Sequence, residues 1–415
     1  MMNRRTLLTS TFGLPLIGAT APTSASALLF EKESRIVVKG KSPKFVARRS
    51  HGVMLLHAQQ LPTGGTDLFY QSSNDVGETF TPPIRINHIQ GEISDHGENS
   101  AQLLTAPDDQ SLYAIWNSRD ANGGSHIRFS RAAAMQTKWS PAITLDDDPA
   151  ENSHGFQGAG VGPDGTIYVA WLDGRDKERS KTGDYTSAGS AVYLTRSTDG
   201  GRTFSKNIRI STDVCPCCRV SFTAVGQRVY FGWRGIDTGD MRDIYIASSG
   251  DKGETWNKPT VVSRDKWKIN GCPHVGPSLA SLNGKLHVSW FSEGGKPGIY
   301  TALSTDGGET FGPRRLVSEG VYDPTHPSSA ASEDRIGMVF QAREGKDSWG
   351  KMAIFYREIL ANGTMSKVIR IGVPKTGSVV YPSLAMGMSG RVIAGWTEVT
   401  GDERVAHMIR ARHGD

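Results

Sequence analysis

The segment Ser304-Thr305-Asp306-Gly307-Gly308-Glu309-Thr310-Phe311 decides the fold, because its pattern recurs along the chain. It has the residues of a turn that satisfies its own hydrogen bonds. The Asp side chain accepts from backbone N–H groups, glycine adopts positive φ, and the aromatic residue packs back between strands. Clear further copies begin at Ser73, Ser197 and Ser249, and weaker ones lie near residues 137–139 and 362–364. One turn repeated in this way predicts a repeat protein.

A short strand that ends in a large residue recurs in register with these turns. Its seven copies end at His57, Trp116, Trp171, Trp233, Trp290, Phe340 and Trp396, at intervals of 50 (290 to 340) to 62 (171 to 233) residues. Four short strands per period of this length are typical of a β-propeller. The expected fold class is therefore all-β, with four-stranded antiparallel blades and the Asp turns between their third and fourth strands.

The number of blades follows from the innermost strands. These are expected to begin near Phe45, Ser100, Gln157, Val220, Pro277, Ser328 and Ser383, which makes seven blades. The last unit supplies only three strands, and the segment Arg35-Ile36-Val37-Val38 is expected to join it and remove an open sheet edge. Six blades, the number in true sialidases, is the alternative.

The four strong turn copies resemble the Asp-box (BNR) sialidase-like β-propeller superfamily. The resemblance covers nearly the whole mature chain, and it implies that the Asp boxes are structural and face away from the usual active site. Three phrases, Cys215-Pro216-Cys217-Cys218, Arg242-Asp243-Ile244 and Gly271-Cys272-Pro273, resemble those of a bacterial group of exported propellers often labelled sialidase by fold. That group supplies no activity to carry over, since fold does not imply function.

The N-terminus predicts an export signal over residues 1–27, followed by a single propeller domain over residues 28–415. Asn3-Arg4-Arg5-Thr6-Leu7-Leu8 resembles a twin-arginine leader, and Ala25-Ser26-Ala27 suits signal-peptide cleavage near Ala27. An ordinary secretory signal is the alternative. The apolar part is too short to span a membrane. Either signal predicts a periplasmic or secreted protein, where disulfides are allowed.

Composition narrows the classes of partner. The chain has 48 Gly, 20 Pro, 37% hydrophobic residues and a net charge of +5, which suits an ordered all-β protein with many turns. It has no long basic run with interleaved aromatic residues, so nucleic acid is not an expected partner.

Cysteine and histidine gather in the connections that run from one blade's outer strand to the next blade's inner strand. These connections lie near the axis on one face, and they carry His96, His154, Cys215, Cys217, Cys218, Cys272, His274 and His326. Thiolates and imidazoles that converge on one axis predict a transition-metal site. Copper is the favoured ion and zinc the alternative. The favoured function is metal handling or a metal-dependent redox step.

Two other interpretations of the cysteines stay open. They could form structural disulfides and bind no metal, or they could do redox thiol chemistry. The adjacent pair Cys217-Cys218 makes pairing of all four awkward, because neighbouring residues rarely cross-link each other.

Arginines in a second set of axial loops suggest two further functions. The sialidase alternative, an exo-α-sialidase-like glycosidase, would use Arg175, Arg234 and Arg343 to clamp a carboxylate and Tyr381 beside the axis. None of these residues lies in a motif that matches the sialidases one by one. The other alternative is a non-catalytic module that binds an anionic small molecule or a glycan, with structural disulfides. The oligomeric state has no signature in the sequence.

Overall fold

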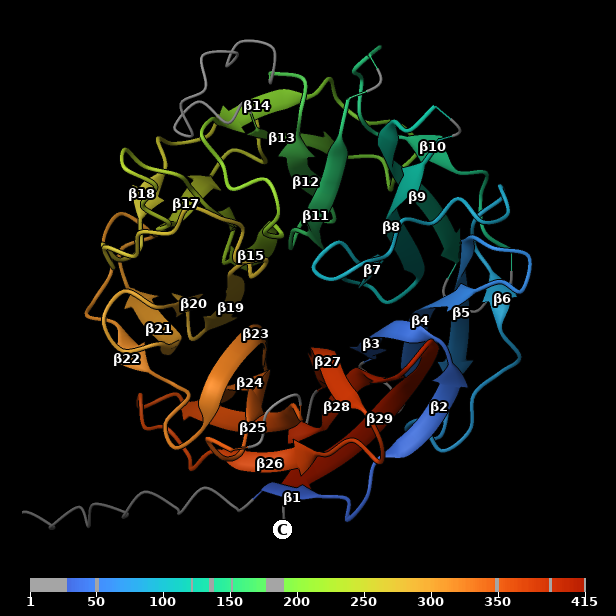
Figure 1. Ribbon diagram of the computed structural model, residues 1–415. Helices are drawn as coiled ribbons and strands as arrows, with labels where there is room; N and C mark the ends of the chain where they lie inside the picture. Colours follow the sequence, from blue (N-terminus) through green and yellow to red (C-terminus); the bar gives the residue numbers. More distant parts are fainter. Residues whose placement is uncertain are drawn as a thin grey trace, which may run out of the picture.

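The computed structural model describes residues 28–48, 52–120, 122–133, 138–150, 152–176, 190–347, 351–387 and 390–413. The export signal predicted for residues 1–27 lies outside them. Six four-stranded units and one five-stranded unit surround one axis in a ring (Figure 1). The predicted seven-bladed propeller is therefore confirmed. In the described part of the chain, no helix has the length and apolar character needed to cross a membrane.

The first four blades follow each other along the chain. Blade one is β3 (Lys41–Ala47), β4 (Val53–Gln60), β5 (Thr66–Ser73) and β6 (Ile84–Arg85). Blade two is β7 (Gln102–Thr105), β8 (Ser111–Arg119), β9 (Ser125–Ala133) and β10 (Ile143–Thr144). Blade three is β11 (His154–Val161), β12 (Ile167–Asp173), β13 (Ala191–Ser197) and β14 (Ile208–Ser211). Blade four is β15 (Ser221–Val225), β16 (Arg228–Arg234), β17 (Ile244–Ser249) and β18 (Thr260–Val261).

The remaining three blades complete the ring. Blade five is β19 (Ser278–Leu282), β20 (Lys285–Ser292), β21 (Gly298–Ser304) and β22 (Arg315–Leu316). Blade six is β23 (Tyr322–Ala331), β24 (Arg335–Arg343), β25 (Ala353–Leu360) and β26 (Ile369–Gly372). Blade seven is β27 (Ser378–Met386), β28 (Val392–Thr400) and β29 (Glu403–His413), joined by β1 (Leu28–Phe30) and β2 (Arg35–Lys39).

The second strand of most blades is almost fully buried, because neighbouring blades cover both of its faces. Every residue of β12 and β24 is buried. The large residues that end the strand repeat, such as Trp171 and Trp396, are fully enclosed. A continuous apolar run of this kind is expected for a strand with no solvent-facing side. The core is thus a series of clusters between neighbouring blades.

The Asp turns have the geometry expected from their sequence. In the turn after β17, Ser249 Oγ donates to Asp251 Oδ1 at 2.7 Å and accepts from Gly253 N–H at 2.8 Å. Thr255 N–H donates to Asp251 Oδ1 at 3.0 Å. Gly253 has a φ of 80°, which a side chain would strain. The Ser, Asp, Gly and Thr of the turn therefore satisfy one another's polar groups, and Arg196 of blade three also donates to Lys252 O at 2.6 Å.

The ring closes through the N-terminal strands. The predicted partner β2 pairs with β29, with Arg35 opposite Met408, and β1 pairs with the far end of the same strand, with Leu28 opposite His413. Both segments run along the outer edge of blade seven (Figure 1). They cover an edge that would otherwise present unpaired backbone groups.

Replacing Ser249 by alanine should destabilise the protein by about 1–3 kcal/mol, because it leaves the buried Gly253 N–H without a partner. Urea unfolding at neutral pH measures the change. The control Thr305→Ala alters the exposed second position of the equivalent turn in blade five and should stay within about 0.5 kcal/mol of wild type. Equal effects of the two substitutions would contradict this role of the serine.

The Asp turns should also contribute to acid sensitivity. Hydrogen bonds from Thr310 and Ser304 lower the pKa of Asp306 from 3.8 to about 2. A carboxylate with a lowered native pKa adds stability above its unfolded pKa and loses it as the pH falls towards the native value. Asp306→Asn should therefore reduce the loss of stability between pH 4 and pH 2, measured by urea unfolding across that range. An unchanged pH dependence would argue against the turn as a source of acid sensitivity.

Candidate metal centre

The loop from β14 to β15 holds three of the four cysteines close to the axis. Its start is fixed by the Cys215 N–H, which donates to Arg234 O at 2.9 Å. Its end is fixed by the Val220 N–H, which donates to Phe156 O of the preceding blade at 2.9 Å. The loop is therefore tied to blade four on one side and to blade three on the other.

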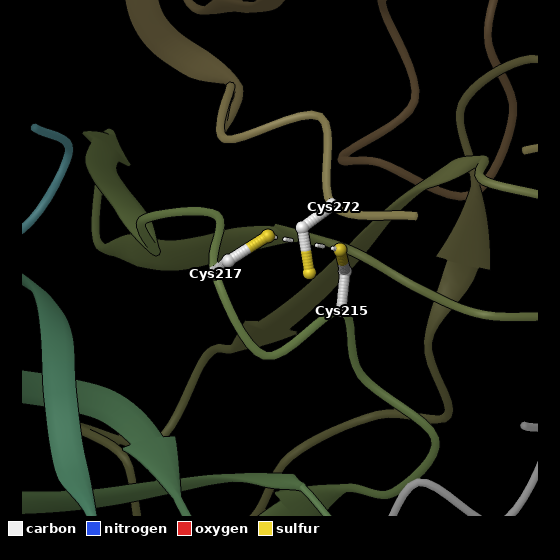
Figure 2. Close-up of side chains that lie close together, drawn as sticks. All are labelled: Cys215, Cys217 and Cys272. Carbon is white, nitrogen blue, oxygen red and sulfur yellow. Dashed lines mark hydrogen bonds between the residues drawn. The ribbon is translucent and has the colours of Figure 1, made fainter. Parts of the chain in front are cut away.

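The sulfur atoms of this loop form a compact triangle. Cys215 Sγ lies 3.7 Å from Cys217 Sγ and 3.6 Å from Cys218 Sγ, and the third edge, from Cys217 to Cys218, is 3.9 Å. Cys272 comes from the next connection, between blades four and five, and its Sγ lies within 4.8 Å of both Cys215 and Cys217. Figure 2 shows Cys272 entering from its own loop to face those two sulfurs.

These distances fit ligands of one ion better than they fit disulfides. Four sulfurs bound at about 2.3 Å around a tetrahedral zinc ion lie about 3.8 Å apart. A disulfide would bring two sulfurs to about 2.05 Å. All four cysteines are free thiols here. The three sulfurs of the loop thus have the spacing of thiolate ligands, and Cys272, from the next blade connection, is grouped with Cys215 and Cys217 but not with Cys218.

The surroundings of the sulfurs are apolar on one side and cationic on the other. Cys215, Cys217 and Cys218 are buried with Ile236, whereas Cys272 is exposed to solvent. The guanidinium of Arg234 is fully buried nearby. It donates to three backbone carbonyls, those of Val275, Arg242 and Phe291, and within the described residues it pairs with no carboxylate.

This uncompensated cation favours negative charge on sulfur. Burial alone would raise the pKa of Cys218, but hydrogen bonds from Cys215 and Cys217 and the charge of Arg234 hold that pKa well below its usual value. Hydrogen bonds to Cys215 and Cys218, together with burial, raise the pKa of Cys217. The triangle can therefore carry one thiolate before any ion arrives, and thiolate is the form that binds metal.

Three of the predicted histidines lie outside the group of sulfur ligands. His274 is exposed, and it adopts a φ of 52°. His326 packs edge-on against Tyr381 with 4.7 Å between ring centroids, and its burial lowers its pKa to about 4. His96 packs edge-on against Phe156. Among the described residues, no histidine nitrogen belongs to the group of ligand atoms that contains Cys215, Cys217 and Cys272.

His154 belongs to a different cluster, between blades two and three. Its Nδ1–H donates to Ser125 O at 2.6 Å, and its Nε2 lies 3.4 Å from Asp148 and 3.5 Å from Asp173. The sequence Asp146-Asp147-Asp148 just upstream was the signal for this acidic environment. The prediction of one ring that includes His154 is therefore not what the structure shows.

The arginines of the sialidase alternative are already engaged by neighbours. Arg175 pairs with Asp147 at 2.8 Å and with Asp173 at 2.9 Å. Arg343 pairs with Asp323 and donates to Lys346 O at 2.7 Å. Arg234 is enclosed by carbonyl oxygens, as described above. The three lie on blades three, six and four, each held by its own partners, so they do not form a shared clamp for a carboxylate.

The axis itself holds charged residues that the sequence did not single out. Glu98 accepts from the Arg219 guanidinium and from the Gly276 N–H, the latter at 2.7 Å. Arg219 follows Cys218 directly, and Glu98 follows His96-Gly97. Their places in these blade connections could have indicated that both side chains lie near the axis. Lys44 and the predicted Tyr381 line the same axial cavity.

Comparison with known proteins shows the fold and no more. No family model matches the chain, and no curated protein is similar enough in sequence to count as a relative. Among solved structures, a protein of unknown function from Dyadobacter fermentans is similar with a TM-score of 0.55 and 16% identity, over 77% of this chain and 96% of that one.

Two enzymes also share this architecture. A Hadza microbial sialidase, Hz136, has a TM-score of 0.51 and 18% identity over 84% of this chain and 73% of its own. An ulvan lyase of polysaccharide lyase family PL25 has a TM-score of 0.55 and 13% identity over 92% and 95%. At such identities the likeness establishes a shared propeller fold alone.

The thiol geometry predicts a pattern of chemical labelling. Metal-free protein, unfolded without reductant, should react with a thiol reagent at four cysteines. Native protein should react first at Cys272, because the other three are buried. Mass spectrometry after timed alkylation gives both results. Fewer than four reactive thiols in the unfolded protein would indicate a disulfide and contradict the geometry described here.

Proposed function

We propose that this protein binds one soft transition-metal ion through Cys215, Cys217, Cys218 and Cys272. The observation that supports the proposal is the spacing of the sulfurs, 3.6 to 3.9 Å within the loop, with Cys272 facing one edge of the triangle. An ion at the centre would replace weak thiol contacts with four coordinate bonds. It would also neutralise a group of buried sulfurs that cannot all be ionised in its absence.

The all-sulfur ligand set supports copper(I) or zinc, since soft thiolates select these ions over magnesium or calcium. We favour copper, in keeping with the export predicted for residues 1–27. Three ligands are buried and the fourth, Cys272, is exposed. A site with one accessible ligand can pass an ion to a partner, and we therefore propose metal handling as the role. A redox step at the metal is the second form of this proposal.

Loading with either ion should give about one equivalent per chain under reducing conditions, measured by elemental analysis after gel filtration. Cys217→Ser should weaken binding by about a hundredfold or more, because even residues that only support a ligand contribute tenfold to a hundredfold. His88→Ala, at an exposed histidine, should leave affinity unchanged.

Competition between copper(I) and zinc on the same protein decides which ion the site prefers. His326→Ala should leave the stoichiometry at one, because that imidazole lies outside the sulfur group. Binding that survives Cys217→Ser, or a preparation that never exceeds a small fraction of one equivalent, would overturn the proposal.

A further inference from the structure

The centre of the ring holds a cavity of about 250 Å³, lined by the inner strands β3, β7, β11, β15, β19, β23 and β27 and the loops beside them. These strands surround the axis in Figure 1. Its wall carries Lys44, Glu98, Arg219 and His326. The cavity is distinct from the sulfurs but adjoins them: Arg219 directly follows Cys218, and Gly276, in the loop of Cys272, donates to Glu98.

Lys44 is a cation without a partner. Its ammonium makes no hydrogen bond or ion pair with any described residue. Two carboxylates near it have other partners: Asp95 Oδ1 accepts from Ser42 Oγ at 2.7 Å and pairs with Lys41 at 3.7 Å, while its Oδ2 has no hydrogen-bond partner in the described part of the chain, and Glu98 pairs with Arg219. Burial and the charge of Arg219 lower the pKa of Lys44 to about 8, against the opposing effect of Asp95 and Glu98. Lys44 is half-buried on the cavity wall, so an anion that enters the cavity can pair with its ammonium.

The rest of the wall offers more donors than acceptors. Ser221 Oγ and Ser278 Oγ each accept a hydrogen bond from a backbone N–H of the next blade, which leaves each hydroxyl proton able to donate into the cavity. Ser329 Oγ and both ring nitrogens of His326 are buried without a hydrogen-bond partner among the described residues, although His326 Nε2 lies 3.9 Å from Glu98 Oε1. Donor-rich walls around an unpaired ammonium suit an anionic ligand.

Charge and size indicate the class of anion. In their charged forms, Lys41, Lys44 and Arg219 exceed Asp95 and Glu98 by one positive charge, which matches a monoanion. The cavity is several times larger than one water's share of liquid volume, about 30 Å³, so it has room for an organic body beside the charged group.

We propose that the axial cavity binds a small organic carboxylate, with the carboxylate on Lys44 and its polar body on the serine hydroxyls and His326. This site is distinct from the proposed metal site, because its ligands are oxygen and nitrogen groups and none of the four sulfurs. It also differs from the arginine clamp considered above, since Arg175, Arg234 and Arg343 take no part.

Isothermal titration with three probes tests the proposal on full-length mature protein, both metal-free and metal-loaded. Gluconate carries a carboxylate and hydroxyls, sorbitol carries hydroxyls without the charge, and inorganic phosphate carries charge without an organic body. Gluconate should bind in both metal states. Sorbitol should bind about tenfold more weakly or worse, because it cannot form a charge-assisted hydrogen bond with Lys44. Phosphate should also bind more weakly than gluconate, because it has no organic body to contact the serine hydroxyls and His326.

Lys44→Met should weaken gluconate binding by about tenfold or more, and Lys44→Arg should restore most of it. Lys285→Met removes a lysine charge at an exposed position of blade five and should have no effect. Thermal unfolding of each variant confirms that it folds.

Three results would overturn the proposal: no gluconate binding at millimolar concentration, equal binding by wild type and Lys44→Met, or phosphate binding as tight as gluconate. Loss of metal binding with gluconate binding intact would reject the metal site alone, so the two proposals fail separately.

Discussion

The pairing of β1 and β2 with β29 is the constraint on which the rest of the molecule depends. Each blade is a small antiparallel sheet that cannot bury both faces alone, and only a closed ring gives every blade two neighbours. Blade seven would have an open edge without the N-terminal strands. Ion pairs reinforce this junction. Arg410, near the C-terminus, pairs with Glu31 and Glu78, which lie near the N-terminus. Closure thus fixes the seven inner strands around one axis.

Closure also explains why residues remote in sequence meet at the axis. The connections between blades approach each other there, and the Asp turns need no help from them because those turns satisfy their own hydrogen bonds. The connections are therefore free to carry chemistry. Two of them bring four sulfurs together, and inner strands place Lys44 and His326 around an enclosed cavity. The same ring thus carries a group of soft sulfur ligands and, next to it, a cavity lined by hydrogen-bond donors.

The fold was predictable from the sequence because its signals are local. The turn around Asp306 and the strand ending at Trp290 depend on residues within a few positions, and a repeat multiplies such signals. The convergence of Cys215 and Cys272 also followed, since both occupy the same position in successive units. The environment of His154 could not be predicted from the sequence. Its partners Asp148 and Asp173 lie on either side of it in sequence, and strand register decides that its ring faces them and not the axis. The isolation of Lys44 could not be predicted either, because it depends on Asp95 and Glu98 being occupied by other side chains.

The central claim is that four sulfurs hold one ion. Metal K-edge X-ray absorption of protein loaded with one equivalent of copper(I) or zinc tests it most directly. The account predicts a first shell made of sulfur at about 2.3 Å, with no histidine nitrogen. A shell dominated by nitrogen or oxygen at about 2.0–2.1 Å would contradict it and would place the ion elsewhere, with the histidines and carboxylates.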